Sequence, residues 1–190
     1  MSTLSTQKTK QYMLPFGCVL GLCLSVTSVS TQAVEVNFSA VFESPTCEVS
    51  APASIDFGNI SSQGIKQGDS LMNPRSLVVS LSNCSGLLSS AQKPGLKVSG
   101  TGNTEAGDFL FMLPATSVAV NYGVLLTTAL NNTVISNGAF IPTTGAAGSL
   151  PSNGTSIAFN AALSCGTQCN NPTTRSGELN AAIIFEFAYE

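Results

Sequence analysis

The chain contains no histidine, no tryptophan and very little charge. Only 9% of its 190 residues are Asp, Glu, Lys or Arg, and the net charge is −3. An average soluble protein has about 25% charged residues. Without histidine, Ser-His-Asp and Cys-His nucleophilic sites are excluded, and so are histidine-ligated metals. The small acidic excess argues against nucleic-acid binding, because phosphate contacts need clustered Lys and Arg.

Collagen-type and coiled-coil repeats are missing as well. Apolar residues nevertheless make up 43% of the chain, which is close to the usual share. Ser, Thr, Asn and Gly take the place of the missing charged residues. A disordered chain is not expected, since disordered segments are poor in apolar residues and rich in charge. The composition therefore indicates a folded protein with an uncharged polar surface.

The first residues have the layout of a secretory signal. Two lysines precede an apolar run over residues 13–26, and small and polar residues follow up to a plausible cleavage point after Ala33. A membrane anchor is the alternative, but the run is shorter than the roughly 20 residues that a membrane helix needs. We expect residues 1–33 to be a signal peptide and residues 34–190 to form a single exported domain.

Four cysteines remain after the signal, and an even number in an exported chain predicts disulfides. They are Cys47, Cys84, Cys165 and Cys169. Three pairings are possible. We prefer Cys47 with Cys84 and Cys165 with Cys169, because the second pair needs only a local turn through Gly166. A zinc site is the alternative, but the spacing and the lack of histidine disfavour it.

Period-two alternation of apolar and polar residues recurs along the chain and predicts β-strands. One such face is Leu77, Val79 and Leu81, and another alternates from Val118 to Leu126. A third covers Ile157 to Leu163. Asn-Gly pairs and prolines separate these segments, as turns do. No segment has a sustained helical period, so we expect an antiparallel β-sandwich or barrel.

The last segment of the chain is unusually apolar for a terminus. Residues 178–190 are expected to form a strand that runs to the last residue, and chain ends normally fray unless they pack against something. One face of this strand consists of Leu179, Ala181, Ile183, Phe185, Phe187 and Tyr189. An isolated strand of this kind would aggregate. We therefore expect this end to pack within the domain or on a partner.

This C-terminal pattern resembles that of chaperone–usher pilus subunits, the family of the type 1 and P pilus pilins. Pilins have a Gly fourteen residues from the end, a penultimate Tyr and alternating apolar residues between them; here these are Gly177 and Tyr189. Cys47 and Cys84 are placed like the family disulfide. The segment Ile55–Ile60 is similar to the one that follows the first cysteine in P pilus minor subunits.

The resemblance implies an incomplete immunoglobulin-like antiparallel β-sandwich that lacks its last strand. A periplasmic chaperone would lend a strand beside the C-terminal strand and hold the carboxylate of Glu190. At the outer-membrane usher, the N-terminal segment of the next subunit would replace it. In this chain the donor segment would be 34–42, in which Val34, Val36, Phe38 and Ala40 point into the groove. Ala40 falls near a position where the family usually has Gly.

The resemblance thus implies a structural subunit of a fimbria on the cell surface, exported through the periplasm, with neighbouring subunits as partners and a role in cell adhesion. A single-domain adhesin that binds a host receptor through its loops is the alternative, although the chain has no Trp to hold a sugar. We do not expect an enzyme, a cofactor or a metal. The carboxylates of Asp56, Asp69, Glu105 and Asp108 fall in turns or loops, where solvated side chains are usual.

Overall fold

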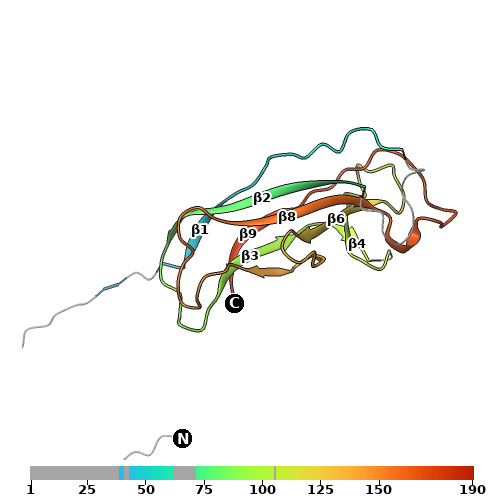
Figure 1. Cartoon of the computed structure of the whole chain (residues 1–190). Coiled ribbons are helices and arrows are strands. Elements are labelled where there is room, and N and C mark those ends of the chain that lie inside the picture. The colour runs from blue at the N-terminus through green and yellow to red at the C-terminus, as the bar shows by residue number, and fades with distance from the viewer. Residues whose placement is uncertain (1–38, 41–42, 62–71, 105) are drawn as a thin grey trace, which may run out of the picture. The chain divides into compact units, whose positions relative to one another are not determined.

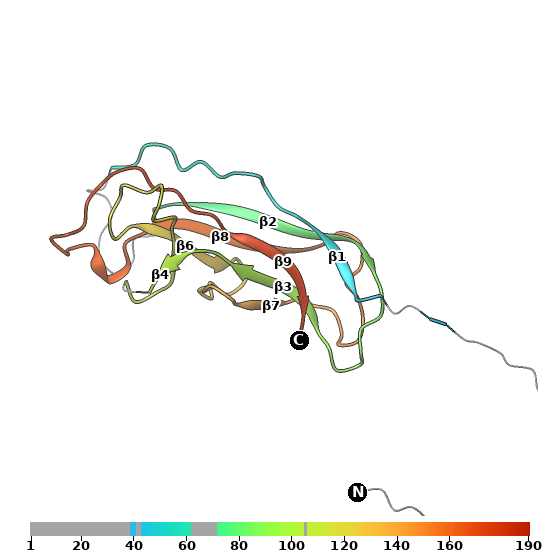
Figure 2. The same ribbon diagram turned by 180° about the vertical axis from the view of Figure 1, so that it is seen from behind.

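The structure is a computed structural model of the chain that describes residues 39–40, 43–61, 72–104 and 106–190. The chain divides into two units, residues 1–40 and residues 41–190. The expected signal peptide and most of the expected donor segment, including Val34, Val36 and Phe38, lie outside the described residues. Within the first unit only Ser39 and Ala40 are described, and both are exposed. The elements labelled in Figures 1 and 2 all belong to the second unit.

Where it is described, the second unit consists of two antiparallel β-sheets and almost no helix. The first sheet has the strand order β1 (Thr46–Ser50), β2 (Met72–Ser85), β8 (Thr155–Ser164), β6 (Gly123–Thr128), β5 (Leu110–Phe111) and β4 (Gly102–Asn103). The second has the order β7 (Phe140–Pro142), β3 (Pro94–Ser99) and β9 (Ile184–Tyr189). A short 3-10 turn, η2, covers Gly166–Gln168. The prediction of an all-β antiparallel fold is confirmed.

The alternating patterns place one face of each long strand in the core. On β2, Val79 and Leu81 are 0% exposed and Leu77 is almost as deeply buried. Val78 and Ser80, which alternate with them, point to the other face of the sheet, and Val78 is 49% exposed. On β8, which pairs antiparallel with β2, Phe159 lies opposite Leu77 and is also fully buried. The strict period of two therefore decides which face is apolar.

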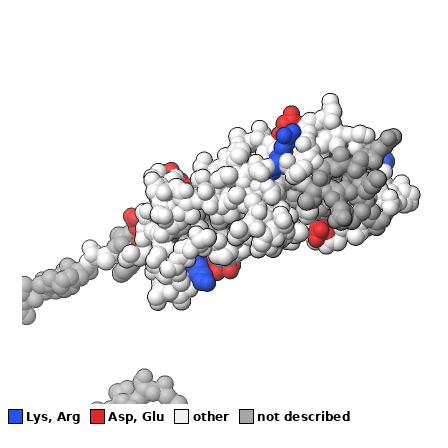
Figure 3. All heavy atoms as spheres, viewed as in Figure 1, with Lys and Arg blue, Asp and Glu red and all other residues white. Residues whose placement is uncertain are grey.

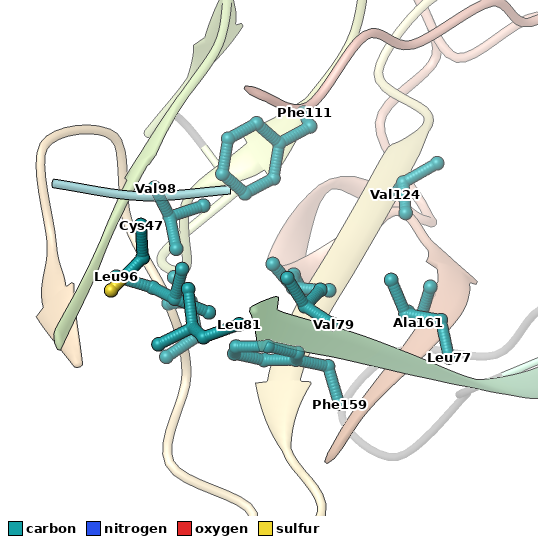
Figure 4. Close-up of a cluster of buried hydrophobic side chains, with 12 residues drawn as sticks. Cys47, Leu77, Val79, Leu81, Leu96, Val98, Phe111, Val124, Phe159 and Ala161 are labelled. Atoms are coloured by element: carbon teal, nitrogen blue, oxygen red, sulfur yellow. The ribbon is translucent and has the colours of Figure 1, made fainter. Parts of the chain in front are cut away.

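The core lies between the two sheets, which makes the fold a sandwich rather than a barrel. Leu96 and Val98 of β3 face Leu81 and Phe159 of the larger sheet, and Cys47 of β1 closes one side (Figure 4). Each large apolar side chain buried here contributes about 1.5–3 kcal/mol to folding. Aligned packing of two antiparallel sheets over such a core is the architecture of immunoglobulin-like sandwiches.

Two disulfides are present among the described residues, and they join the pairs that we preferred from the sequence. Cys47 on β1 bonds to Cys84 near the end of β2 and so connects neighbouring strands. Cys165 bonds to Cys169 across the 3-10 turn that follows β8. The first closes a long loop and the second a short one, so the first is expected to stabilise the fold more.

Two predicted strands are shorter in the structure than their sequence patterns indicated. β6 begins only at Gly123, and Val118 is 65% exposed. The last strand, expected over residues 178–190, is regular only from Ile184 to Tyr189. The residues before these two strands form backbone hydrogen bonds with each other: Val118 and Ala119 donate to Glu178, and Leu113 donates to Asn180. Because these segments pair with each other, regular pairing with the neighbouring strands starts later on both β6 and β9.

Candidate functional site

The strand β9 is an edge strand whose outer side has no hydrogen-bonded strand among the described residues. It pairs with β3 in a continuous antiparallel register, and it is the last strand of its sheet. Glu190 and Lys93 exchange two backbone hydrogen bonds, of 3.1 and 2.6 Å. In an antiparallel pair such residues alternate with residues whose N–H and C=O point away from the partner. The backbone groups of Phe185, Phe187 and Tyr189 therefore point to the free edge.

The hydrogen bonds of β3 indicate the same alternation of backbone groups along β9. Val98 lies opposite Phe185 in the register, but its N–H donates to Ala139, on the side away from β9. Upstream of the strand, the carbonyls of Glu178 and Asn180 accept hydrogen bonds from residues 113–119. Because backbone groups alternate in direction along the chain, every second residue from Leu179 to Tyr189 points its N–H and C=O away from β3 and from residues 113–119. These are the positions whose side chains form the apolar face.

The apolar face of β9 is only partly covered. Ile183, Phe185 and Phe187 pack against the core, yet each remains half-buried. The ring of Phe185 lies 5.3 Å from the ring of Phe159, measured between centroids. The neighbouring strand β3 places the fully buried Val98 and Leu96 directly opposite Phe185 and Phe187. The missing cover is therefore on the free side of β9.

The opposite wall is the irregular segment that follows β1. Its side chains Ile55 and Phe57 pack against the core from the edge of the larger sheet. Asp56 accepts a 2.8 Å hydrogen bond from the N–H of Gly58, and the side chain of Asn73 donates one of 2.9 Å to the carbonyl of Phe57. These bonds hold the segment in place although it has no strand partner within the described part of the chain.

A cleft of about 820 Å³ lies between this wall and the residues before β9. Its sides are residues 54–60 and 176–180, and Ala119, Tyr122 and Leu163 also line it. Further along, β1 and β9 are in contact at the edges of the two sheets, as Figure 2 shows. The cleft is lined on this side by residues 176–180, and beyond it the outer edge of β9 has no hydrogen-bonded strand among the described residues. We call the cleft together with this edge the edge groove and bound it by residues 54–60 and 176–189.

Gly177 lies very close to the backbone of Val118 and Ala119. A Cβ atom at this position would lie 2.9 Å from the backbone nitrogen of Ala119 and 3.0 Å from the carbonyl carbon of Val118. Real Cβ atoms rarely come that close to backbone atoms. A larger residue would push one side of the cleft away from its base, which gives a physical reason for glycine in the terminal pattern.

The loop that leads into Gly177 is fastened at several points. Besides the Cys165–Cys169 disulfide, the side chain of Asn121 donates to the hydroxyls of Thr173 and Thr174, at 3.0 Å each. Asn121 adopts a left-handed conformation, with φ of 66°. The sequence patterns did not point to this residue. The signal that could have found it is the tolerance of Asn for such a conformation within a predicted strand.

The structure brings most of the predicted C-terminal residues together on the edge groove, with some differences. Leu179, Ile183, Phe185, Phe187 and Tyr189 are half-buried, whereas Ala181 and Glu190 are exposed. Ala40 is exposed, and the other donor residues lie outside the described part. The roles of these residues remain predictions.

The rest of the described chain offers few features of other kinds. No group of three or more His, Cys, Asp or Glu side chains lies close enough there to hold a metal ion. Asp69 and Glu105 lie outside the described residues. Where the structure describes the chain, no helix has the length and hydrophobicity to cross a membrane. Charged side chains are sparse on the face in Figure 3, which is mostly uncharged.

Comparison with known proteins finds neither a matching family model nor a matching curated sequence. Among solved structures, the chain is similar to the P pilus rod subunit PapA, with 20% identity and a TM-score of 0.46, over 83% of this chain and 100% of that one. It is also similar to a chain from a chaperone–usher pilus, with 18% identity and a TM-score of 0.48, over 86% of this chain and 99% of that one. Both likenesses are distant.

Proposed function

We propose that residues 34–190 form a structural subunit of a chaperone–usher fimbria, assembled by donor-strand exchange and contributing to cell adhesion. The observation that carries the proposal is the free edge of β9, whose apolar face is half-buried beside a cleft. An apolar edge strand is a site for pairing with another chain. Strand addition at such an edge combines main-chain hydrogen bonds with pockets for alternate side chains.

In this proposal the sandwich lacks a strand between β9 and the segment after β1. A strand laid in the edge groove would meet the free backbone groups of Phe185, Phe187 and Tyr189, and its inward side chains would cover the rings of these residues. The segment 34–42 has the required alternation. Nine extended residues span roughly 30 Å, which is comparable to the length of the edge from Leu179 to Phe187.

The expected partners follow from the same geometry. A periplasmic chaperone would first supply the strand and hold the C-terminal carboxylate of Glu190. At the outer-membrane usher, the N-terminal segment of a neighbouring subunit would then take its place, and the product would be a surface fimbria. Such a role is structural and involves no catalysis. No observation favours the adhesin alternative, because the exposed Leu87 and Leu130 stand singly on separate loops, as is common.

The test is to compare the chain 34–190 with a version that carries a second copy of residues 34–42 fused through a flexible linker after Glu190. We expect the fused chain to be monomeric and clearly more stable to urea, and the unfused chain to polymerise or aggregate. The matched control is the same fusion with Val36→Asp and Phe38→Asp in the added copy, which should behave like the unfused chain. Reversible unfolding of the unfused chain at the stability of the fusion would contradict the proposal.

A further inference from the structure

The outward side of the edge groove carries acidic residues at defined positions. Glu186 is exposed in the middle of β9, on the face opposite to Phe185 and Phe187. Glu178 is exposed on the side of the cleft, where its carboxylate accepts a 3.0 Å hydrogen bond from the side chain of Asn180. Asp56 lines the cleft from the opposite wall. No Lys or Arg is among the described residues that line it.

Two lysines approach β9 from the side of β3. Lys97 of β3 lies opposite Glu186 in the register, and Lys93 exchanges backbone hydrogen bonds with Glu190. A strand added at the free edge would lie about 5 Å from β9 but about 10 Å from β3, one Debye length at ordinary salt. Its outward side chains would therefore interact mainly with Glu186 and less with Lys97.

The alternation of backbone hydrogen bonds along β9 would bring Glu186 close to the side chain opposite it on the added strand. Phe185 and Phe187 point their backbone groups to the free edge, so Glu186 between them would form a non-hydrogen-bonded pair with the added strand. Side chains in such pairs approach each other more closely than in hydrogen-bonded pairs. Like charges directly opposite one another on adjacent strands are destabilising.

The chain's own donor segment is acidic where it would meet these residues. Residues 34–44 contain Glu35 and Glu43 and neither Lys nor Arg. In an antiparallel arrangement, the register that sets Val34 opposite Phe187 fills the groove as far as Leu179. That same register sets Glu35 opposite Glu186 and Glu43 opposite Glu178. A second copy of this chain would therefore bring two acidic pairs into contact.

We propose that the preferred donor for this groove is a strand from a different polypeptide, with a basic residue opposite Glu186 and a basic or neutral residue opposite Glu178. This inference rests on the proposed function, and it adds the chemistry of the partner. A basic residue opposite Glu186 would continue, on a third strand, the row of alternating charges that Lys97 and Glu186 begin. Opposite-charge pairs on neighbouring strands are favourable.

The test uses synthetic peptides added in excess while the chain 34–190 refolds from denaturant. One peptide has the sequence of residues 34–44, and a second carries Glu35→Lys and Glu43→Lys. A control peptide carries Asn37→Lys and Ser39→Lys, which adds the same number of lysines at positions that would face Ile184 and Ala182. The yield of soluble one-to-one complex and the dissociation rate of the labelled peptide are measured at about 50 mM and about 1 M salt, which bracket the range over which exposed charges become screened.

At low salt, we expect the dissociation rate of the Glu35→Lys, Glu43→Lys peptide to be lower, by a factor of roughly three or more, than that of the peptide with the chain's own sequence. The reason is that each cross-strand charge pair changes affinity by up to about fivefold. High salt and the substitutions Glu178→Gln and Glu186→Gln in the chain should both reduce this difference. An equal or slower dissociation of the own-sequence peptide would overturn the inference. So would an equal gain for the control peptide, or a gain that persists in the Gln-substituted chain. Failure of every peptide to bind would overturn the proposed function itself, and this inference with it.

Discussion

Phe185 on β9 lies directly opposite Val98 on β3, yet Val98 is 0% exposed and Phe185 is only half-buried. Paired residues on the same face of a sheet usually have similar exposure. The difference in exposure between Val98 and Phe185 shows that Val98 lies inside the sheet and Phe185 at its open edge. The side chain of Val98 is covered by the larger sheet and by both neighbouring strands. Among the described residues, Phe185 has a hydrogen-bonded strand on one side only, since β1 contacts β9 without pairing with it. This asymmetry makes the free side of β9 the place where substitutions should separate strand capture from folding.

Charge on the inward face of β9 should abolish capture by a donated strand. In Phe185→Asp or Phe187→Asp, a carboxylate would sit between the core and the incoming strand, where burying an unpaired charge is costly. We expect such variants to be lost from co-purification with the chaperone. The matched control is Ile184→Asp, on the same strand but 54% exposed on the opposite face, which should still be captured. Normal capture of the Phe variants would place the binding site elsewhere.

Deletion of residues 34–38 should separate the two steps of assembly. The acceptor groove lies in the second unit, so chaperone binding should be unchanged. Addition of the deleted subunit to the groove of its neighbour should stop, because the side chains that fill that groove are gone. Chaperone complexes and polymers can be counted separately by gel filtration and electron microscopy. Loss of both steps together would mean that this segment belongs to the core.

Replacement of Gly177 by alanine should damage the groove more than the overall fold. The added Cβ would lie 2.9 Å from the backbone nitrogen of Ala119, so one side of the cleft has to move. We expect donor-peptide binding to weaken by roughly tenfold, equivalent to about 1.4 kcal/mol. Gly145→Ala is the control, because a Cβ there would meet its nearest neighbour, the hydroxyl of Thr143, only at 3.7 Å. Equal binding by both variants would refute the role given to Gly177.

The two disulfides should contribute unequally to stability. On the chain-entropy model, opening the 47–84 loop costs roughly 4 kcal/mol and opening the 165–169 loop roughly 2 kcal/mol. Urea denaturation of the fused, self-complemented chain with paired Cys→Ser substitutions measures both values. The short disulfide fastens the loop before Gly177, so its removal should also speed donor dissociation. The prediction fails if removing the short disulfide destabilises the fold more than removing the long one.

Replacement of a core leucine by alanine should lower the free energy of unfolding far more than the same replacement of an exposed leucine. Leu81 is 0% exposed between the sheets, and Leu81→Ala should lower the free energy of unfolding of the self-complemented chain by about 2–5 kcal/mol. Leu87, which is 90% exposed, offers the same chemical change on the surface. Leu87→Ala should lie within about 0.5 kcal/mol of the parent. Thermal or urea unfolding distinguishes the two outcomes.

The all-β class, the inward faces of β2 and β8 and the preferred disulfide pairing could all be predicted from local sequence patterns. These features depend largely on residues a few positions apart, because the two-residue period and the short turn through Gly166 are local. The sequence also identified Phe185 and Phe187 as members of one apolar face.

The ends of the strands and the position of β9 at the edge of its sheet depend on long-range contacts and could not be predicted from local patterns. β6 and β9 start late because residues 113–120, which lie before β6, form backbone hydrogen bonds with residues 175–180, which lie before β9. The exposed position of Val118, the role of Asn121 and the contact between Gly177 and Ala119 depend on the same long-range meeting of segments. An alternating pattern fixes which way a side chain points, but the number of neighbours that a strand acquires depends on how the whole chain closes around the core.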